Sequence, residues 1–393
     1  MNNKGSNVFD QIRADAGNND VSAALEKLVA NLTEKRLYHP LFEAIKLQTR
    51  HRLNLPLLFD QRREKLDSKI QSELESGLLE ACRTVGLLLV ADQKLGEAWV
   101  YLQPLDDRAL FESLLEKYKV IDDNADEVID VALMQMAAPA TGFRLVLERY
   151  GTCDGISTFE SLAHTFDAEY RTQLSEILVD HLHAELIENL KNHLSQNKPT
   201  HLTDDLSLEN LIRNRDKILT DAGPLVDATH LASTMRIGRS VNSRERQLQL
   251  CEMAQYGCLL DESYQFEGDS PFENTFADHL TYYRALVADS IDANEVTQAI
   301  EFFDNKSKAS ADDPFNPVAD EVFVDLLFRL GHSSQAIQAS LDRLANRAEL
   351  AGIAPSVHQM ATRPEHFQML QSHFQERDDL LGFTISVLNP PSQ

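Results

Sequence analysis

The feature that most constrains the fold is the helical spacing of apolar residues, which is clearest between Asp292 and Leu344. This stretch contains three helix-forming segments, Glu295–Lys308, Val318–Leu330 and Ser334–Leu344. Alternating runs of Val, Ile and Thr next to hairpin turns, which are typical of strands, are scarce in the chain. The sequence therefore predicts an all-α fold in which successive helices pack against one another.

The same helical period recurs in earlier parts of the chain, so we predict further helices there. They are expected at Val21–Arg36, Leu41–Leu53, Glu64–Ala91, Asp106–Lys119, Ala125–Ala137, Ala168–Ser195, Asp227–Met235, Ser243–Tyr256 and Phe272–Asp289. Gly77 and Gly86 lie inside one of these segments, and each glycine costs a helix about 1 kcal/mol relative to alanine. Their presence indicates either a close approach of two helices or a break.

Four further predictions concern a turn, a helix start, a short apolar segment and a domain boundary. A turn is expected at Gly151–Gly155, and a helix start at Ser157–Glu160, which has the spacing of a capping box. Phe383–Val387 is expected to form a short strand or extended packing. The polar stretch around Pro199 is the best candidate for a domain boundary. We therefore expect an N-terminal helical array, residues 1–198, and a C-terminal helical-repeat array, residues 199–393.

The last third of the chain contains spacings that resemble the tetratricopeptide repeat. Phe303 lies four residues after Ala299, and Ala336 lies five residues after Gly331. The two alanines are 37 residues apart, near the repeat length of about 34 residues. Ser340 stands where the repeat has an aromatic residue. The resemblance implies an irregular α-solenoid of antiparallel helix pairs.

A second resemblance covers most of the chain. Five short segments are similar to landmarks of a family of uncharacterised bacterial all-helical proteins: Tyr38–Ala44, Gly96–Trp99, Tyr150–Cys153, Asp227–Leu231 and Pro271–Glu273. This resemblance implies an all-helical fold, and it implies no particular activity.

The charge of the chain argues against two classes of partner. Its 393 residues include 62 acidic and 37 basic side chains, which gives a formal net charge of -25. Such a surface repels phosphate backbones and anionic lipids, so we expect neither nucleic-acid nor membrane binding. The chain lacks an apolar run of about 18 residues, and Met1–Asp10 lacks the apolar core of a secretory signal. The four cysteines do not form a disulfide framework, so a reducing cytoplasm is the expected location.

The sharpest candidate for a polar site is the pair Asp227 and His230, together with Asp278 and His279. Residues three apart share one helix face, so Asp227 and His230 could present an oxygen and a nitrogen to one ligand. His279 would then complete a site from another helix. The alternative is that Asp227 caps the start of a helix and that the histidine is hydrogen-bonded in the core or a groove.

A local group of basic residues stands out in this acidic chain: Arg213, Arg215, Lys217, Arg236, Arg239, Arg244 and Arg246. Guanidinium forks suit carboxylate or phosphate groups on a partner. The alternative is internal pairing with acidic helices such as Asp122–Asp130. Aromatic residues are not interleaved with the group, which again disfavours nucleic acid.

No phosphate-binding or nucleophile-elbow motif occurs in the chain, so we expect no cofactor, no metal and no catalytic residues. The favoured function is a non-enzymatic interaction scaffold that binds a protein or peptide in a groove. The groove is expected to carry Arg236, Tyr282 and Tyr283, with Arg239 and Asp278 as further candidates. The alternative is a helical enzyme or ligand-binding protein with a polar or metal site around Asp227, His230 and His279. The sequence leaves the oligomeric state open.

Overall fold

The predicted all-α fold is confirmed by the computed structural model, which describes residues 7–58, 66–197, 208–212, 223–309, 317–345, 347 and 349–389. Within these ranges the chain is helical, and its only β interaction is an isolated antiparallel bridge between Glu267 and Asn274. Contacts divide the chain into two compact units, Met1–Arg149 (unit 1) and Tyr150–Gln393 (unit 2). The boundary near Pro199 lies outside the described residues and stays a prediction.

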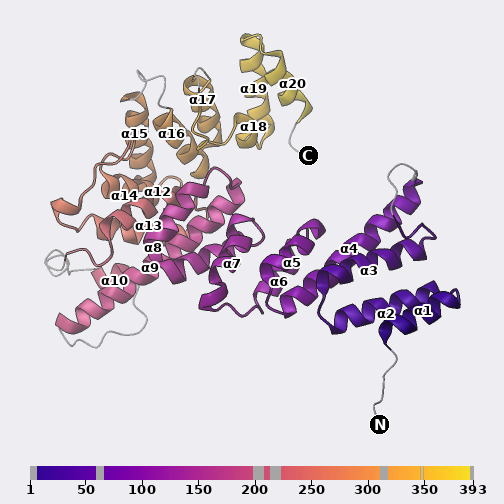
Figure 1. Ribbon diagram of the computed structural model, residues 1–393. Coiled ribbons are helices and arrows are strands. Elements are labelled where there is room, and N and C mark those ends of the chain that lie inside the picture. Colours follow the sequence, from indigo (N-terminus) through magenta and orange to yellow (C-terminus); the bar gives the residue numbers. More distant parts are fainter. Residues whose placement is uncertain are drawn as a thin grey trace. The chain divides into compact units, whose positions relative to one another are not determined.

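Unit 1 is built from helices, and the first five of these helices contact their neighbours in chain order (Figure 1). They are α1 Val8–Gly17, α2 Val21–Glu34, α3 Tyr38–Arg52, α4 Ser68–Ala91, α5 Leu95–Leu102, α6 Arg108–Leu115 and α7 Ala125–Ile129. Short 3-10 turns occupy Gln103–Leu105 and Asp122–Asn124, and a π-helical turn occupies Asp130–Met134. Their apolar faces form one core, with Leu41, Val85 and Leu95 almost fully buried.

The two glycines of α4 mark close approaches between helices, and the helix is continuous from Ser68 to Ala91. A Cβ at Gly77 would collide with the side chain of Thr49 on α3. A Cβ at Gly86 would lie 2.6 Å from Cγ of Leu102 on α5. Close packing is therefore the correct one of the two interpretations of these residues.

Gly86→Ala is expected to lower the free energy of unfolding by about 1–3 kcal/mol, because Leu102 must move in a filled core. The better helix propensity of alanine offsets part of this cost. Gly17→Ala is the matched control, since Gly17 ends α1 and no atom lies within 4 Å of the added Cβ. Chemical denaturation of both variants measures the difference, and a Gly86 variant at least as stable as wild type would contradict the packing argument.

The turn predicted at Gly151–Gly155 is confirmed only at Gly151, and the helix start predicted at Ser157 is wrong, because residues 152–162 are helical. One helical segment, α8, runs from Pro139 to Leu162 and is kinked at Gly151, where φ is +84°. Glycine adopts this backbone conformation without steric cost, and because it is not helical, Gly151 separates two helical segments within α8. Glu160 is consequently not a capping residue, and its carboxylate can pair with a side chain of another helix.

Unit 2 contains the remaining helices. They are α9 Ala168–Asn197, α10 Leu208–Ile212, α12 Ala228–Ile237, α13 Arg244–Gly257, α14 Thr275–Leu286, α15 Asn294–Ala309, α16 Val318–Arg329, α17 Ser333–Arg343, α18 Val357–Met360, α19 Pro364–Glu376 and α20 Leu380–Leu388. The turns Gly238–Ser240 and Glu262–Tyr264 are 3-10 helical. From α12 to α17 each helix contacts the next one in the chain, as Figure 1 shows.

The long helix α9 supplies a buried row of leucines to the core of unit 2. Leu174, Leu178, Leu182, Leu186, Leu190 and Leu194 are all buried. Because a spacing of four residues drifts around a 3.6-residue helix, the row meets more than one neighbour. Accordingly, α9 contacts α10, α12 and α13.

The C-terminal apolar segment is helical, which corrects the expectation of a strand or extended packing. Phe383–Val387 lies inside α20, whose first turn is capped by the side chain of Asp379. None of the helices in the described ranges combines the length and the apolar character that crossing a membrane requires.

Candidate functional site

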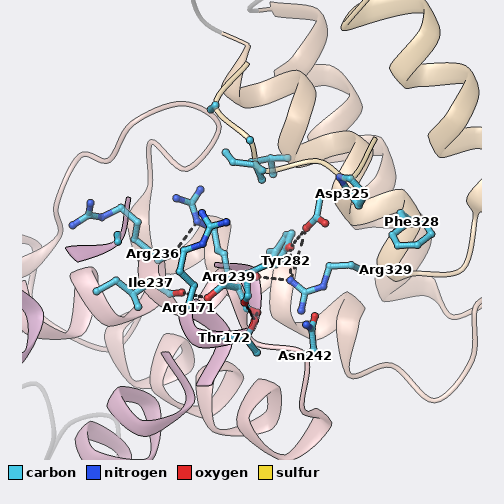
Figure 2. Close-up of a pocket in the computed structure, with 18 of the residues that line it drawn as sticks. Arg171, Thr172, Arg236, Ile237, Arg239, Asn242, Tyr282, Asp325, Phe328 and Arg329 are labelled. Atoms are coloured by element: carbon cyan, nitrogen blue, oxygen red, sulfur yellow. Dashed lines mark hydrogen bonds and ion pairs between the residues drawn. The ribbon is translucent and has the colours of Figure 1, made fainter. Parts of the chain in front are cut away.

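Unit 2 contains a pocket of about 720 Å³ that is formed by segments distant in the sequence. The end of α8, the start of α9, the end of α12 with the turn after it, and α16 contribute side chains, together with Tyr282 of α14 (Figure 2). A loop at residues 351–355 completes the lining. The apolar part of the lining consists of Phe159, Ala163, Ala168, Ile237, Val322, Phe328, Ala351, Ile353 and Pro355.

The charged part of the lining is dominated by arginine. Arg171, Arg236, Arg239 and Arg329 face two carboxylates, Glu160 and Asp325. In the described part of the chain, the pocket therefore carries two more positive than negative charges, in a protein whose net charge is -25. How each arginine is paired decides what the pocket can bind.

Arg329 is fully engaged by the protein itself. Its Nη1 donates to the carbonyl of Arg239 at 2.5 Å and to the hydroxyl of Tyr282 at 3.1 Å, and its Nη2 donates to the carbonyl of Val241. The carboxylate of Asp325 lies 3.8 Å from Nη1 and accepts the Tyr282 hydroxyl at 3.2 Å. Figure 2 shows Arg329 joined to Tyr282 and Asp325 in this way. Arg329 thus fastens α16 to the turn after α12.

Arg236 forms an ion pair with Glu160, the residue that the capping-box interpretation had assigned to a helix start. Both side chains are exposed, with fractions of 51% and 42%. A pair of this kind contributes little to stability and can open when a competing anion arrives. Arg236 therefore remains available to a ligand.

Arg239 and Arg171 make no ion pair with any carboxylate in the described ranges. Nε of Arg239 donates to the carbonyl of Arg236 at 3.1 Å, and its guanidinium carbon lies 4.8 Å from the centre of the Phe272 ring. Burial lowers the pKa of Arg239, although an arginine stays protonated near neutral pH. The Arg171 side chain makes no hydrogen bond to another described residue. These two half-buried guanidinium groups are the unsatisfied donors of the pocket.

Glu321 holds the loop that forms one wall of the pocket. Its buried carboxylate accepts hydrogen bonds from the backbone N–H groups of Ala351, Ile353 and Ala354, at 2.5, 2.6 and 3.2 Å. Charge-assisted bonds of this type are strong and directional. The position of the Ile353 side chain is therefore fixed by α16.

The floor of the pocket is fixed by hydroxyl groups. Oγ of Ser175 on α9 lies 2.7 Å from Oγ of Ser240, and Oγ1 of Thr172 lies 3.1 Å from the carbonyl of Ser240. These contacts attach the first turns of α9 to the turn at Gly238–Ser240. Arg171 and Arg239, one on each segment, are thus supported by a rigid base.

Asp227 is a helix cap, the alternative that the sequence left open. Its Oδ1 accepts the N–H of Thr229 at 2.8 Å and that of His230 at 3.4 Å, at the start of α12. These bonds lower the pKa of Asp227, with the Thr229 hydroxyl as the largest cause. Neither Asp227 nor His230 lines the pocket.

Asp278 and His279 are buried beside the pocket. Nδ1 of His279 donates to the carbonyl of Thr275 at 2.6 Å, and its ring stacks on Phe272 at 4.1 Å between centroids. Burial, with a smaller effect of nearby Arg239, lowers the pKa of His279 to about 3. Asp278 accepts the N–H of Asn274 at 3.0 Å, and burial raises its pKa.

Of the two adjacent tyrosines, only Tyr282 lines the pocket. Burial raises its pKa to about 12. Tyr283 is buried and donates to the carbonyl of Met235 at 2.6 Å, so it ties α14 to α12. The structure thus brings Arg236, Arg239 and Tyr282 together at one pocket. The other five predicted site residues do not line it: Asp227, His230, Asp278, His279 and Tyr283.

Two of the remaining basic residues have acidic partners. Arg244 pairs with Asp289 and Arg246 with Asp180, whereas Arg213, Arg215 and Lys217 lie outside the described residues. Within the described ranges, no group of three His, Cys, Asp or Glu side chains is placed to hold a metal ion.

Sequence reasoning missed Arg171, Glu160, Asp325 and Arg329. Val322, Asp325 and Phe328 are spaced three apart on α16, which is a helical face and the one available signal.

Comparisons of the chain with known protein families, with curated proteins and with solved structures found no match.

Proposed function

We propose that the protein is a non-enzymatic interaction scaffold that binds a segment of a protein partner in the pocket of unit 2. The observation that supports this function is the combination of an apolar wall with two arginines, Arg171 and Arg239, that have no carboxylate partner in the described ranges. Arginine and aromatic residues in a pocket are typical of sites that dominate protein–protein binding energy. A cytoplasmic location, and a tetratricopeptide-like solenoid of antiparallel helix pairs, belong to the same proposal.

The chemistry of the lining favours binding over catalysis. Among the described lining residues there is no histidine, lysine or cysteine. Asp325 is held by Arg329 and is not free to act as a general base, whereas Glu160 pairs with Arg236 in an exposed ion pair. The hydroxyl of Thr172 is hydrogen-bonded to backbone carbonyls, not to a base.

Replacing both unpaired arginines is expected to abolish partner binding. The double variant Arg171→Ala, Arg239→Ala loses the two spare positive charges, and Arg244→Ala is the control because Arg244 pairs with exposed Asp289 outside the pocket. Each purified chain is incubated with extract of the source cells, cross-linked and analysed by quantitative mass spectrometry. The proposal predicts proteins that wild type and the control retain and that the double variant loses. Equal retention by all three chains would contradict it.

A further inference from the structure

The charges in the pocket indicate the chemical class of the group that it binds. Arg329 is saturated by two carbonyls, a hydroxyl and Asp325. Arg236 has Glu160 as its partner. Once these two pairs are set aside, the excess of two positive charges resides on Arg171 and Arg239.

The position of Arg171 adds to the positive potential. It lies in the first turn of α9, where the helix dipole is also positive. A cation at this end of a helix is unfavourable unless an anion is near, and the Arg171 side chain forms no ion pair in the described ranges, although Glu169 lies in the same turn. The surrounding protein is strongly acidic, so this pocket is a local exception and not part of a general attraction for anions.

We propose that the pocket takes the phosphate of a phosphorylated side chain on the partner segment, an inference that rests on the proposed scaffold function. A phosphate monoester carries about two negative charges near pH 7 and three acceptor oxygens, which matches two unpaired guanidinium groups. One carboxylate would leave one of the two charges uncompensated. Phe159, Phe328 and Ile353 form the apolar wall for the residues beside the phosphorylated one.

Calorimetric titration of the full chain tests the chemistry directly. The probe is a short capped peptide of phosphoserine flanked by leucines, and its comparison peptides carry serine or glutamate at the same place. Free O-phosphoserine and inorganic phosphate are titrated separately. We expect the phosphopeptide to bind at least about tenfold more tightly than either comparison peptide and than free phosphoserine. Equal binding of the glutamate peptide, or of free phosphoserine, would overturn the proposal.

Single variants locate the bound phosphate. Arg171→Ala and Arg239→Ala are each expected to weaken phosphopeptide binding by about tenfold or more, because each removes a charged donor. Arg244→Ala should leave the affinity unchanged. Circular dichroism checks that each variant is folded. An Arg171 or Arg239 variant that is folded and binds as tightly as wild type contradicts the assignment.

Treatment of the cell extract with phosphatase separates this inference from the scaffold function. If the partner is lost both from the double variant and after phosphatase treatment, both proposals are supported. If the double variant loses the partner but phosphatase treatment has no effect, the scaffold function is supported and the proposal of phosphate binding is wrong. If the double variant keeps the partner, the scaffold function itself fails at this pocket.

Discussion

Arg329→Met is expected to lower the free energy of unfolding by about 3–5 kcal/mol, the range for breaking a buried ion pair from one side. The side chains of Arg329 and Asp325 are only 11% and 16% exposed. Methionine fills much of the arginine volume but leaves Asp325 without its cation and the carbonyls of Arg239 and Val241 without their donor. Burial already raises the pKa of Asp325, so its uncompensated charge is costly.

Urea denaturation of the purified chain measures this effect, followed by far-ultraviolet circular dichroism. Arg244→Met is the control, because it removes an arginine from an exposed pair with Asp289 and should change stability very little. If Arg329→Met lowers the free energy of unfolding no more than the control does, the contacts of Arg329 between α16 and the turn after α12 do not stabilise the fold.

The helices themselves could be predicted because their signals are local. The expected start of Val21–Arg36 coincides with that of α2, and Val318–Leu330 differs from α16 by one residue. Apolar residues at helical spacing set these elements, and Asp20 caps the first of them by accepting the N–H of Ala23. Apolar spacing and capping residues can both be read from the few residues around each helix.

Errors arose where a local signal had two physical outcomes. Gly151 does interrupt the helix, but residues 152–155 are helical, so the break is confined to one residue and is not a five-residue turn. Phe383–Val387 is rich in apolar and β-branched residues, yet Asp379 caps a helix start in front of it. For Phe383–Val387, the helix cap in front of the segment overrides the β-propensity of its side chains.

The pocket could be predicted only in part because its charges are set by tertiary pairing. The sequence shows that Arg236, Arg239, Arg244 and Arg246 are close along the chain, but not which of them find carboxylates. Asp289 and Asp180 neutralise two of them, and Glu160 of α8 takes a third. Arg171 carried one readable signal, a cation in the first turn of a long helix, where the dipole disfavours it.

His279→Phe is expected to reduce the loss of stability at acid pH. Because burial lowers the native pKa of His279 to about 3, and the unfolded value is about 6.5, only the unfolded chain binds this proton between those values. The free energy of unfolding of the wild type therefore falls as pH falls through that window, by about 1.4 kcal/mol per pH unit from this group. Phenylalanine cannot bind the proton, and it retains a ring to stack on Phe272.

The measurement is a set of urea denaturation curves for both chains between about pH 8 and pH 4.5, since the difference between chains cancels the contributions of other groups. Above about pH 7.5 the two stability profiles should run parallel, because the histidine is then neutral in both states. Below pH 6.5 they should converge or cross, with a relative change of about 2–3 kcal/mol by pH 4.5. Parallel profiles throughout would mean that the native pKa of His279 is close to its unfolded value, so that burial does not lower it.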